Sequence, residues 1–440
     1  MTNRLISVTS VMAPKASRPL TALIPLLIPS TVIAWALAGN RWASWGVEAL
    51  EPKTSSSTSF GDLANITATA ECIHAGTDIS VCDPYGRPYQ PYVVLPARIL
   101  NAFGLGTDQT GALGYVLAAL FVITVATLGL VLARKWEGSL ATLIGAQALL
   151  ALSAITPPMM LAIERGQIEI LAFALVLVAL LLLNSRGNVP RAIGALSGVL
   201  ATWTKFFALG LFAPFISRDT FRRRANWWAL AGLLVSLGIL LASWSDIQQA
   251  AVASRSDLPA TSKSQFGSVT LIATLLTSSP VGYGPDADIA DRWSSIRIIG
   301  WVVVAVGIVL AIALVPRSVR IDLDGRPIVS TLLLGSTGVL VLPYLLGASH
   351  DYRLIFLLLT LTGVLIWMSG STGASRLLSI TMTIAIAVAL VTSASMVPTP
   401  SGFIWPKWAL TVGDLCLLFL VSTTAGIWCR RLVAKPSHAE

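Results

Sequence analysis

Charged residues are scarce in this chain of 440 residues, of which Asp, Glu, Lys and Arg make up only 12%. A soluble domain averages about a quarter charged residues, whereas 55% of this chain is hydrophobic. The scarcity of charge excludes a soluble globular protein. Because long apolar runs cross a membrane as helices, the composition predicts an all-α polytopic membrane protein.

Several familiar sequence features are also missing. The chain has no phosphate-binding loop of the GxxxxGK type, no heptad region, no clear internal repeat and no soluble domain between the apolar runs. These absences exclude a P-loop ATPase and a coiled coil. We therefore expect a single transmembrane domain over residues 1–440.

Cysteine is rare as well, with four residues in the whole chain. Cys416 and Cys429 lie in or at the end of the last apolar run, and Cys72 and Cys82 fall in the first long loop. Two cysteines alone make a poor zinc site, but a loop in an oxidising compartment favours a disulfide. We predict a Cys72–Cys82 disulfide and no metal site.

The apolar runs that are present define the spans. About twenty apolar residues cross a bilayer, and ten such runs lie at 20–39, 112–133, 141–160, 167–184, 226–244, 295–315, 328–347, 353–370, 376–396 and 409–428. Residues 190–217 form a further run, broken near its middle by Lys205. We interpret this run as a helical hairpin or re-entrant pair with Lys205 near its tip, which gives eleven to twelve helices.

The net charge of +9 would suit a nucleic-acid surface, but its distribution argues for another origin. With the N-terminus in the cytoplasm, the cytoplasmic segments hold more than half of the 30 basic residues and fewer than a quarter of the 21 acidic residues. This asymmetry follows the positive-inside rule. It predicts a plasma-membrane protein with both termini in the cytoplasm, membrane lipids as partners and no nucleic acid.

Two segments outside the spans are long. Residues 40–111 form the first outer loop, with one helix expected from FGDLANITATAECIHAG and an interfacial helix at 92–103. Residues 245–294 form the second outer loop, where FGSVTLIATLLTS predicts another interfacial helix. Both loops face the extracytoplasmic side in this topology.

Ionisable groups near membrane depth are candidates for function, because each costs about 2.5–3.5 kcal/mol on insertion scales. Asp62 begins the helix after the first span, as a first-turn acid or as a catalytic base for an acceptor hydroxyl. Glu164 and Gln167 open a later span and suit hydrogen bonds to sugar hydroxyls. In the same stretch, Arg165 and Glu169 are i,i+4 partners, which is also compatible with a structural pair.

Lys205 lies alone in the apolar stretch ATWTKFFALG, where it either snorkels to the surface or contacts a phosphate. The outer junction GASHDYRLIF holds His350, Asp351 and Arg353. If residues from 349 onward are helical, His350 and Arg353 share a face and suit a phosphate clamp. Asp351 points elsewhere, as a cap or as a further substrate contact. The alternative is an ordinary charged helix start.

In order along the chain, these motifs resemble the polyprenyl-phosphate-sugar-dependent glycosyltransferases with the C-type multi-span fold. The chain is most similar to family 87, which includes envelope mannosyltransferases and arabinofuranosyltransferases of actinobacteria. Asp62 matches an outer-loop aspartate of this family, and Asp83-Pro84-Tyr85 matches its D-P-Y element. The sequence YQPY at 89–92 matches a Y-P-P element, although Gln90 replaces a proline.

The longest match runs from ERGQIEILAF to AIGALSGVLATWTKFFALGLFAPFISRDTFRRR. The late junction ASHDYRLI keeps one of two family histidines. The resemblance implies Asp62 as general base, His350 near the donor phosphate or acceptor, and Lys205 and Arg353 as phosphate contacts. It further implies substrate-binding roles for the following residues: Asp83, Tyr85, Tyr89, Glu164, Gln167 and Asp351.

The function implied by this resemblance is transfer of a sugar, mannose or arabinofuranose, from a polyprenyl-phosphate donor to a glycolipid or polysaccharide acceptor outside the cell. No cofactor and no metal are expected, because protein cations neutralise the leaving phosphate. A transporter or lipid-linked-sugar flippase is an alternative, but such proteins tend to bind substrate at the midplane between repeated halves. A structural membrane protein without chemistry is a further alternative.

Overall fold

The computed structural model of this chain describes residues 15–39, 60–77, 91–216, 226–242, 265–276, 287–346, 349–392 and 407–433. Nearly all of these residues are helical. The longer helices are α1 (Leu23–Gly39), α2 (Gly61–His74), α3 (Pro91–Ala102), α4 (Thr110–Lys135), α5 (Leu140–Ser153), α6 (Pro157–Glu164), α7 (Glu169–Leu183), α8 (Asn188–Thr204), α9 (Trp227–Ala242), α11 (Ser268–Leu276), α12 (Ala287–Leu314), α13 (Arg317–Asp324), α14 (Pro327–Leu346), α15 (Leu357–Gly370), α16 (Gly373–Thr392) and α17 (Lys407–Val433).

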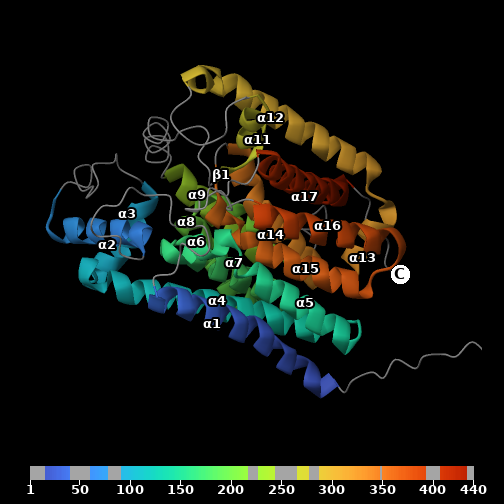
Figure 1. Cartoon of the computed structure of the whole chain (residues 1–440), viewed down its shortest axis with the longest axis horizontal. Coiled ribbons are helices and arrows are strands. Elements are labelled where there is room, and N and C mark those ends of the chain that lie inside the picture. Colours follow the sequence, from blue (N-terminus) through green and yellow to red (C-terminus); the bar gives the residue numbers. More distant parts are fainter. Residues whose placement is uncertain are drawn as a thin grey trace, which may run out of the picture.

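Shorter elements connect these helices. The 3₁₀ helices are η1 (Lys15–Ala22), η5 (Thr107–Gln109), η6 (Phe206–Phe215) and η8 (Asp351–Phe356). Two strands of two residues each, β1 (Gln265–Phe266) and β2 (Ser349–His350), pair antiparallel. In Figure 1, α2 and α3 lie at one end of the helical bundle and α13 lies at the other.

The membrane-spanning helices follow the predicted apolar runs. Within the described residues, seven helical stretches are long and apolar enough to cross a membrane, and α5 with α6 counts as an eighth when this pair, bent by 49°, is taken as one broken span. The shorter apolar helices α7 and α9 cover the two remaining runs. Each of the ten predicted spans therefore contains a helix, and the all-α polytopic membrane class is confirmed.

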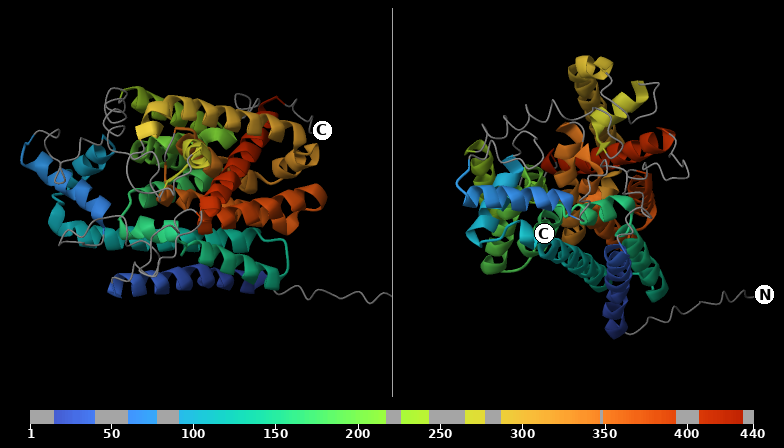
Figure 2. Two further views of the ribbon diagram at one scale, coloured as in Figure 1. Left: turned by 45° about the horizontal axis from the view of Figure 1, so that its top comes forward. Right: turned by 60° about the vertical axis from the view of Figure 1, so that its left-hand side comes forward.

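The spans differ in how much protein surrounds them. In α14 and α15, 72% and 78% of the apolar window is buried, against 28% for the first span and 22% for α12. Figure 2 shows α1 and α12 on opposite flanks of the bundle. On α12, Val302, Val306 and Val309 stay more than half exposed. Because lipid is the solvent there, we interpret these flanks as lipid-facing and α14–α15 as the centre.

The central helix α15 is buried on every side from Leu357 to Trp367. Its polar groups are satisfied within the protein, as burial requires. The Thr362 hydroxyl donates to the Leu358 carbonyl at 2.9 Å, and the Thr360 hydroxyl lies 2.7 Å from the Ser336 hydroxyl of α14. The Thr362 bond lies within α15, whereas the Thr360–Ser336 contact joins the two central helices.

The predicted break at Lys205 is present. The helix α8 ends at Thr204, Lys205 adopts an extended conformation with φ −148° and ψ 113°, and η6 begins at Phe206. Helices α8 and η6 pack against each other, and η6 also packs along α14. The run 190–217 is thus two helical pieces that turn at Lys205.

Two glycines bring η6 and α14 into backbone contact. A Cβ atom on Gly210 would collide with the carbonyl group of Gly338, and a Cβ on Gly338 would collide with the carbonyl oxygen of Gly210. Small residues permit such close approach of helices in membranes. This crossing holds η6, and with it the turn at Lys205, against α14.

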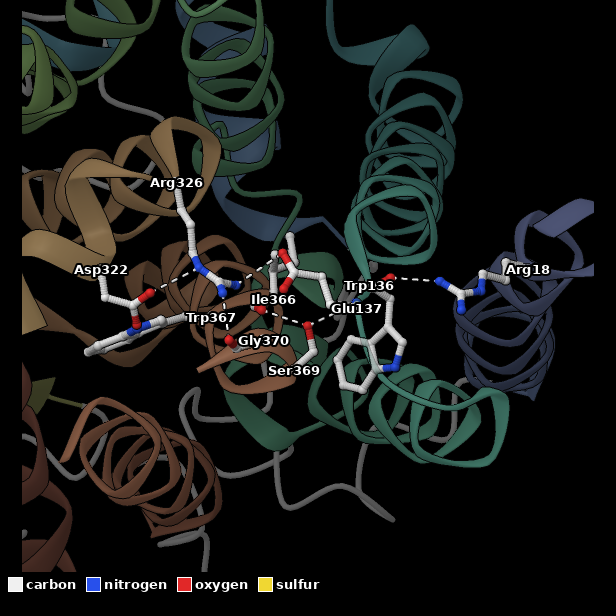
Figure 3. Close-up of polar contacts among 9 residues, drawn as sticks. All are labelled: Arg18, Trp136, Glu137, Asp322, Arg326, Ile366, Trp367, Ser369 and Gly370. Carbon is white, nitrogen blue, oxygen red and sulfur yellow. Dashed lines mark hydrogen bonds and ion pairs between the residues drawn. The ribbon is translucent and has the colours of Figure 1, made fainter. Parts of the chain in front are cut away.

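Three helix junctions, α4–α5, α13–α14 and α15–α16, meet at the α13 end of the bundle around Arg326. The Arg326 guanidinium lies 3.2 Å from Glu137 Oε1 and 3.1 Å from Asp322 Oδ1, and its Nη2 donates to the Gly370 carbonyl at 2.6 Å. The indole of Trp367 donates to Asp322 Oδ2 at 2.7 Å. Figure 3 shows these groups converging on the Arg326 fork.

Further contacts connect η1, which carries Arg18, to the α13 end of the bundle. Arg18 Nη1 donates to the Trp136 carbonyl at 2.7 Å, and the Glu137 backbone N–H donates to the Ser369 hydroxyl at 3.2 Å, as drawn in Figure 3. Every junction in this Arg326 cluster belongs to a segment that the charge pattern assigns to the cytoplasm. Segments predicted on one side of the membrane are thus gathered at one end.

The predicted second outer loop is attached to the bundle through its described elements α11 and β1. The Gly267 backbone N–H donates to Asp414 Oδ1 at 3.3 Å, and the Ser268 hydroxyl donates to the Tyr344 carbonyl at 3.0 Å. The Tyr344 hydroxyl donates to the Asp414 carbonyl at 3.1 Å. Since β1 pairs with β2, this attachment also positions the chain at His350.

The glycine crossing makes a stability prediction. Gly338→Ala places a methyl group against the backbone of Gly210, and overpacking of this kind costs about 1–3 kcal/mol. We expect a clearly lowered thermal unfolding temperature in detergent. The matched control is Gly145→Ala in α5, where an added Cβ meets no atom within 4 Å and helix propensity favours alanine by about 0.5–1 kcal/mol. Equal melting temperatures for the two variants would contradict the backbone contact.

Candidate functional site

Asp62 is positioned by the way α2 begins. The backbone N–H of Phe60 donates to the Glu164 carbonyl at 2.5 Å, and those of Asp62 and Leu63 donate to the Arg165 carbonyl at 3.0 and 3.2 Å. The first N–H groups of a helix lack partners within the helix. Here the loop between α6 and α7 supplies them, so the start of α2 is docked onto that loop.

Gly166 allows this docking. Its φ of +62° lies in the left-handed region, which favours glycine. A Cβ at Gly166 would lie 2.9 Å from Leu63 Cβ and 3.0 Å from Phe60 Cβ, so the space is already filled. The glycine of the ERGQ motif therefore serves both the turn after α6 and the close approach of α2.

The Asp62 carboxylate is held by two side chains from the same loop. Arg165 Nη1 lies 3.2 Å from Asp62 Oδ1, and the Gln167 amide donates to Asp62 Oδ2. The Asp62 side chain keeps 29% of its surface exposed, whereas Gln167 is buried. The carboxylate is thus fixed in direction but open to a bound molecule.

The predicted pairing of Arg165 with Glu169 is wrong. Helix α6 ends at Glu164 and α7 begins at Glu169, so the turn at Gly166 separates the two residues and they do not share a helical face. Arg165 pairs with Asp62 instead. Glu169 points into the protein, where its side chain is fully buried.

Glu169 lies between two cations from distant parts of the chain. Lys205 Nζ is 3.0 Å from Glu169 Oε1, and Arg353 Nε is 3.6 Å from the same oxygen. The lysine comes from the break between α8 and η6, and the arginine from η8. We call Glu169, Lys205 and Arg353 the charge trio.

An aromatic wall supports the arginine. The Arg353 guanidinium carbon lies 5.4 Å from the centroid of the Phe207 ring, within the range of a cation–π contact. Phe207 in turn packs edge-to-face on Phe356, with ring centroids 5.9 Å apart. Both rings are buried, so the arginine is stacked on a rigid surface.

The charge trio and Asp62 both involve the turn between α6 and α7. Gln167, which binds Asp62, is separated from Glu169 by a single residue, so their Cα atoms lie at most about 7 Å apart. Asp62 is therefore bonded to Gln167, and Arg353 is paired with Glu169, two positions further along the same turn. That Asp62 and Arg353 act in one site stays a prediction.

Other predicted residues are placed only in part. His350 lies in β2 opposite Gln265, and Asp351 begins η8. The residues at 349–350 form a strand, so the i,i+3 helical argument for His350 and Arg353 does not apply. Glu164 ends α6 beside Arg165. Positions outside the described residues are Asp83, Tyr85, Tyr89 and Cys82.

The described cysteines include one disulfide-bonded residue and two free thiols. Cys72 is disulfide-bonded, and Cys416 and Cys429 are free thiols. Because Cys82 lies outside the described residues, its pairing with Cys72 stays a prediction. Within the described part of the chain, no three His, Cys, Asp or Glu side chains gather in a way that would hold a metal ion.

Glu169 was missed by the sequence reasoning, although a signal existed. It is the acidic residue that opens the apolar helix EILAFALVLVALLLL, and Lys205 is a lone base in another apolar run. Two isolated opposite charges near membrane depth usually pair. The short-range pairing of Arg165 with Glu169 concealed this long-range one.

A second anchor fastens α2 near its far end. Glu71 Oε1 accepts hydrogen bonds from the Thr107 backbone N–H at 2.6 Å and the Thr107 hydroxyl at 2.5 Å. The bonds from the Thr107 hydroxyl and N–H lower the pKa of the Glu71 carboxyl. Together with the Thr67–Thr110 hydroxyl contact of 2.6 Å, this anchor holds α2 against the start of α4.

Comparison with known proteins gives one family and one structure. Residues 88–343 match the model of glycosyltransferase family 87, which is more than half of the chain and includes Arg165, Gln167, Glu169 and Lys205. The crystal structure of ArnT from Cupriavidus metallidurans bound to undecaprenyl phosphate is similar with a TM-score of 0.38 and 12% identity, over 96% of this chain and 78% of that chain. A search of curated proteins found no match.

The Glu71 anchor makes a prediction about acid. A lowered pKa means that the anchor stabilises the fold above the ordinary value of 4.5 and is lost as pH falls through the lower folded value. The carboxylate is exposed, so its contribution is below about 1 kcal/mol. Glu71→Gln should melt earlier than the wild type at pH 7, and the difference should shrink as the pH falls below 4.5. A difference that stays the same over the whole acid range would refute the anchor.

The charge trio makes a prediction about stability. Lys205→Met leaves Glu169 buried with one cation fewer, and breaking a buried ion pair costs about 3–5 kcal/mol. The double variant Lys205→Met, Glu169→Gln also removes the buried carboxylate that has lost its nearer cation, and should recover much of that loss. A double-mutant cycle of unfolding temperatures measures the coupling. Additive effects would show that the two residues do not interact.

Proposed function

The chain belongs to glycosyltransferase family 87, and from its site we propose that it transfers a sugar from a polyprenyl-phosphate donor to a glycolipid or polysaccharide acceptor. The observation that carries this proposal is one partly exposed, oriented carboxylate, Asp62, bonded to Gln167, which lies two positions before Glu169, the ion-pair partner of Lys205 and Arg353. A base and a phosphate clamp are the two parts that this reaction needs.

Asp62 acts as the general base in this proposal. As the acceptor hydroxyl oxygen bonds to the anomeric carbon, the bond from that carbon to the donor phosphate oxygen breaks, and the hydroxyl proton passes to Asp62. Arg165 and Gln167 hold the carboxylate in direction, so that one oxygen faces the acceptor. Proton transfer by a positioned carboxylate contributes typically about 10²–10⁴-fold to the rate.

Lys205 and Arg353 receive the leaving group. The electron pair of the broken bond goes to the phosphate, which departs as polyprenyl monophosphate with one more negative charge than the donor phosphodiester. Fixed cations near such developing charge stabilise the transition state. Arg353 is held on the Phe207 ring, so the arginine does not reorganise when the charge appears.

The stereochemistry follows from the number of reacting groups. A single displacement with one base and one leaving phosphate inverts the anomeric carbon, whereas retention needs a second carboxylate as nucleophile. The proposed sugar is mannose or arabinofuranose, on the strength of the family resemblance. Membership of a glycosyltransferase family favours transfer over transport.

The proposed location is the outer face of the plasma membrane. The Arg326 cluster gathers segments that the positive-inside rule assigns to the cytoplasm, and α2, which carries Asp62, lies at the opposite end of the bundle in Figure 1. Both termini are then cytoplasmic. Residues 40–111 and 245–294 form the two outer loops in this topology.

The remaining candidate residues are assigned to substrate. We place His350 near the donor phosphate or the acceptor and Asp351 beside it, because both immediately precede Arg353. Glu164 adjoins the loop that holds Asp62. Three residues of the first outer loop are proposed as acceptor or donor contacts by resemblance, namely Asp83, Tyr85 and Tyr89.

The base assignment is tested with Asp62→Asn, which keeps shape and removes proton affinity. Membranes carrying the protein are assayed with radiolabelled polyprenyl-phosphate mannose and polyprenyl-phosphate arabinose. Transfer should fall at least about 10²-fold, with expression and membrane insertion unchanged. The matched control is Asp108→Asn, in the exposed turn before α4, which should transfer normally. Full activity of Asp62→Asn would refute Asp62 as the base.

A further inference from the structure

Phe60, two residues before Asp62, has an unusual backbone conformation. It is the N-cap residue of α2, with φ 77° and ψ 38°, and among the described residues no other non-glycine residue has a positive φ. A side chain disfavours this left-handed region, and a bulky aromatic residue there is an outlier. Such a conformation persists only where the surrounding contacts enforce it.

The backbone of Phe60 is bonded on both sides. Its N–H donates to the Glu164 carbonyl at 2.5 Å, and its carbonyl accepts the Ala64 N–H at 2.9 Å as the first bond of α2. The cap residue of a helix normally has an extended backbone and uses its side chain to bond the helix start. Phe60 instead connects α2 to the end of α6 through its backbone, which leaves its ring to make other contacts.

The Phe60 ring fills the space between two glycines of different elements. A Cβ on Gly114 of α4 would lie 2.3 Å from Phe60 Cδ2, and a Cβ on Gly166 would lie 3.3 Å from Phe60 Cδ1. These atoms are on opposite edges of the ring, which is buried. The ring also packs edge-to-face on Tyr115 with centroids 5.7 Å apart. Phe60 thus connects α4 with the loop between α6 and α7.

These contacts bear directly on Asp62. Its backbone N–H donates to the Arg165 carbonyl at 3.0 Å, and its carboxylate contacts the side chains of Arg165 and Gln167. Those partners fix Asp62 on the loop between α6 and α7. The Phe60 ring adds the contact with α4, so it fixes the start of α2 relative to a long helix of the bundle.

Resting on the proposed function, we infer that Phe60 is a positioning residue for Asp62. Its left-handed backbone and its enclosed ring set the direction from which the carboxylate meets the acceptor hydroxyl. A misplacement of about 1 Å can cost on the order of 10²-fold in rate. Lys205 and Arg353 lie on other elements, so loss of the Phe60 ring impairs transfer and leaves donor binding intact.

Phe60→Ala tests this division. Binding of polyprenyl-phosphate mannose is measured on the full-length chain in lipid nanodiscs, which gives the donor affinity and the number of binding sites. Transfer from the same radiolabelled donor is measured in membranes and expressed per binding site, so a smaller folded fraction does not count as lost activity. We expect transfer per site to fall on the order of tenfold or more, with unchanged donor affinity. The matched control is Phe419→Ala, which removes a partly buried ring of α17 and should keep normal transfer per site.

A second pair of variants reaches the same contact from α4. Gly114→Ala drives a methyl group into the Phe60 ring and should lower transfer per site in the same way. The double variant Phe60→Ala, Gly114→Ala has room for that methyl group, so its loss should match that of Phe60→Ala alone and not the product of both losses. The matched control is Gly111→Ala, where an added Cβ meets no atom within 4 Å. If Phe60→Ala does not fold, Gly114→Ala against Gly111→Ala tests the contact.

The outcomes separate this inference from the proposed function. Wild-type transfer per site in Phe60→Ala would overturn the inference, and so would losses that multiply in the double variant or a donor affinity that falls as much as transfer does. In each case, a strong loss of transfer in Asp62→Asn leaves the proposed function standing. A fully active Asp62→Asn would overturn the assigned base and the positioning role of Phe60 together.

Discussion

The site depends on a charge balance near membrane depth, where water is scarce and an unpaired ion is costly. Glu169 brings together Lys205 and Arg353, which are separated by almost 150 positions in the chain. The fully buried carboxylate is paired with both cations, so removing either cation weakens the pairing of a buried charge. The α7 start, the α8–η6 turn and η8 are therefore fixed relative to one another by electrostatics as well as by packing.

Ion pairs occur both at the α13 end of the bundle and at the candidate site, but their arrangement differs. At the Arg326 cluster, the ion pairs and the hydrogen bond to the Gly370 carbonyl join loops, and the Glu137 side chain stays about half exposed. At the candidate site, Lys205 and Arg353 instead share one carboxylate, Glu169, whose side chain is fully buried. The first arrangement holds loops together at the surface, whereas the second buries one negative charge beside two cations. Similar ionic groups thus serve structure at one end and the proposed chemistry at the other.

Much of the fold was predictable because the membrane imposes simple rules. Each of the ten predicted apolar runs contains a helix, and the isolated Lys205 marked the turn between α8 and η6. For the candidate site, individual residues could be proposed from the sequence, but not their contacts. The contacts between these residues depend on the turn at Gly166 and on the strand β2. Local sequence spacing predicted the wrong partner for Arg165 and suggested a helix at His350. Glu169 was missed because long-range pairing leaves no local periodicity.

The contact between Gly210 and Gly338 has a consequence for the distance between Lys205 and Arg353, the two cations of the proposed phosphate clamp. Because the backbones of η6 and α14 touch at these two glycines, no flexible side chain lies between the helices there. A shift of η6 along α14 therefore cannot be absorbed by a change of side-chain conformation at this crossing. Lys205 immediately precedes η6, and Arg353 follows α14 by way of the short strand β2. The positions of the backbones of η6 and α14 therefore set the distance between the two cations.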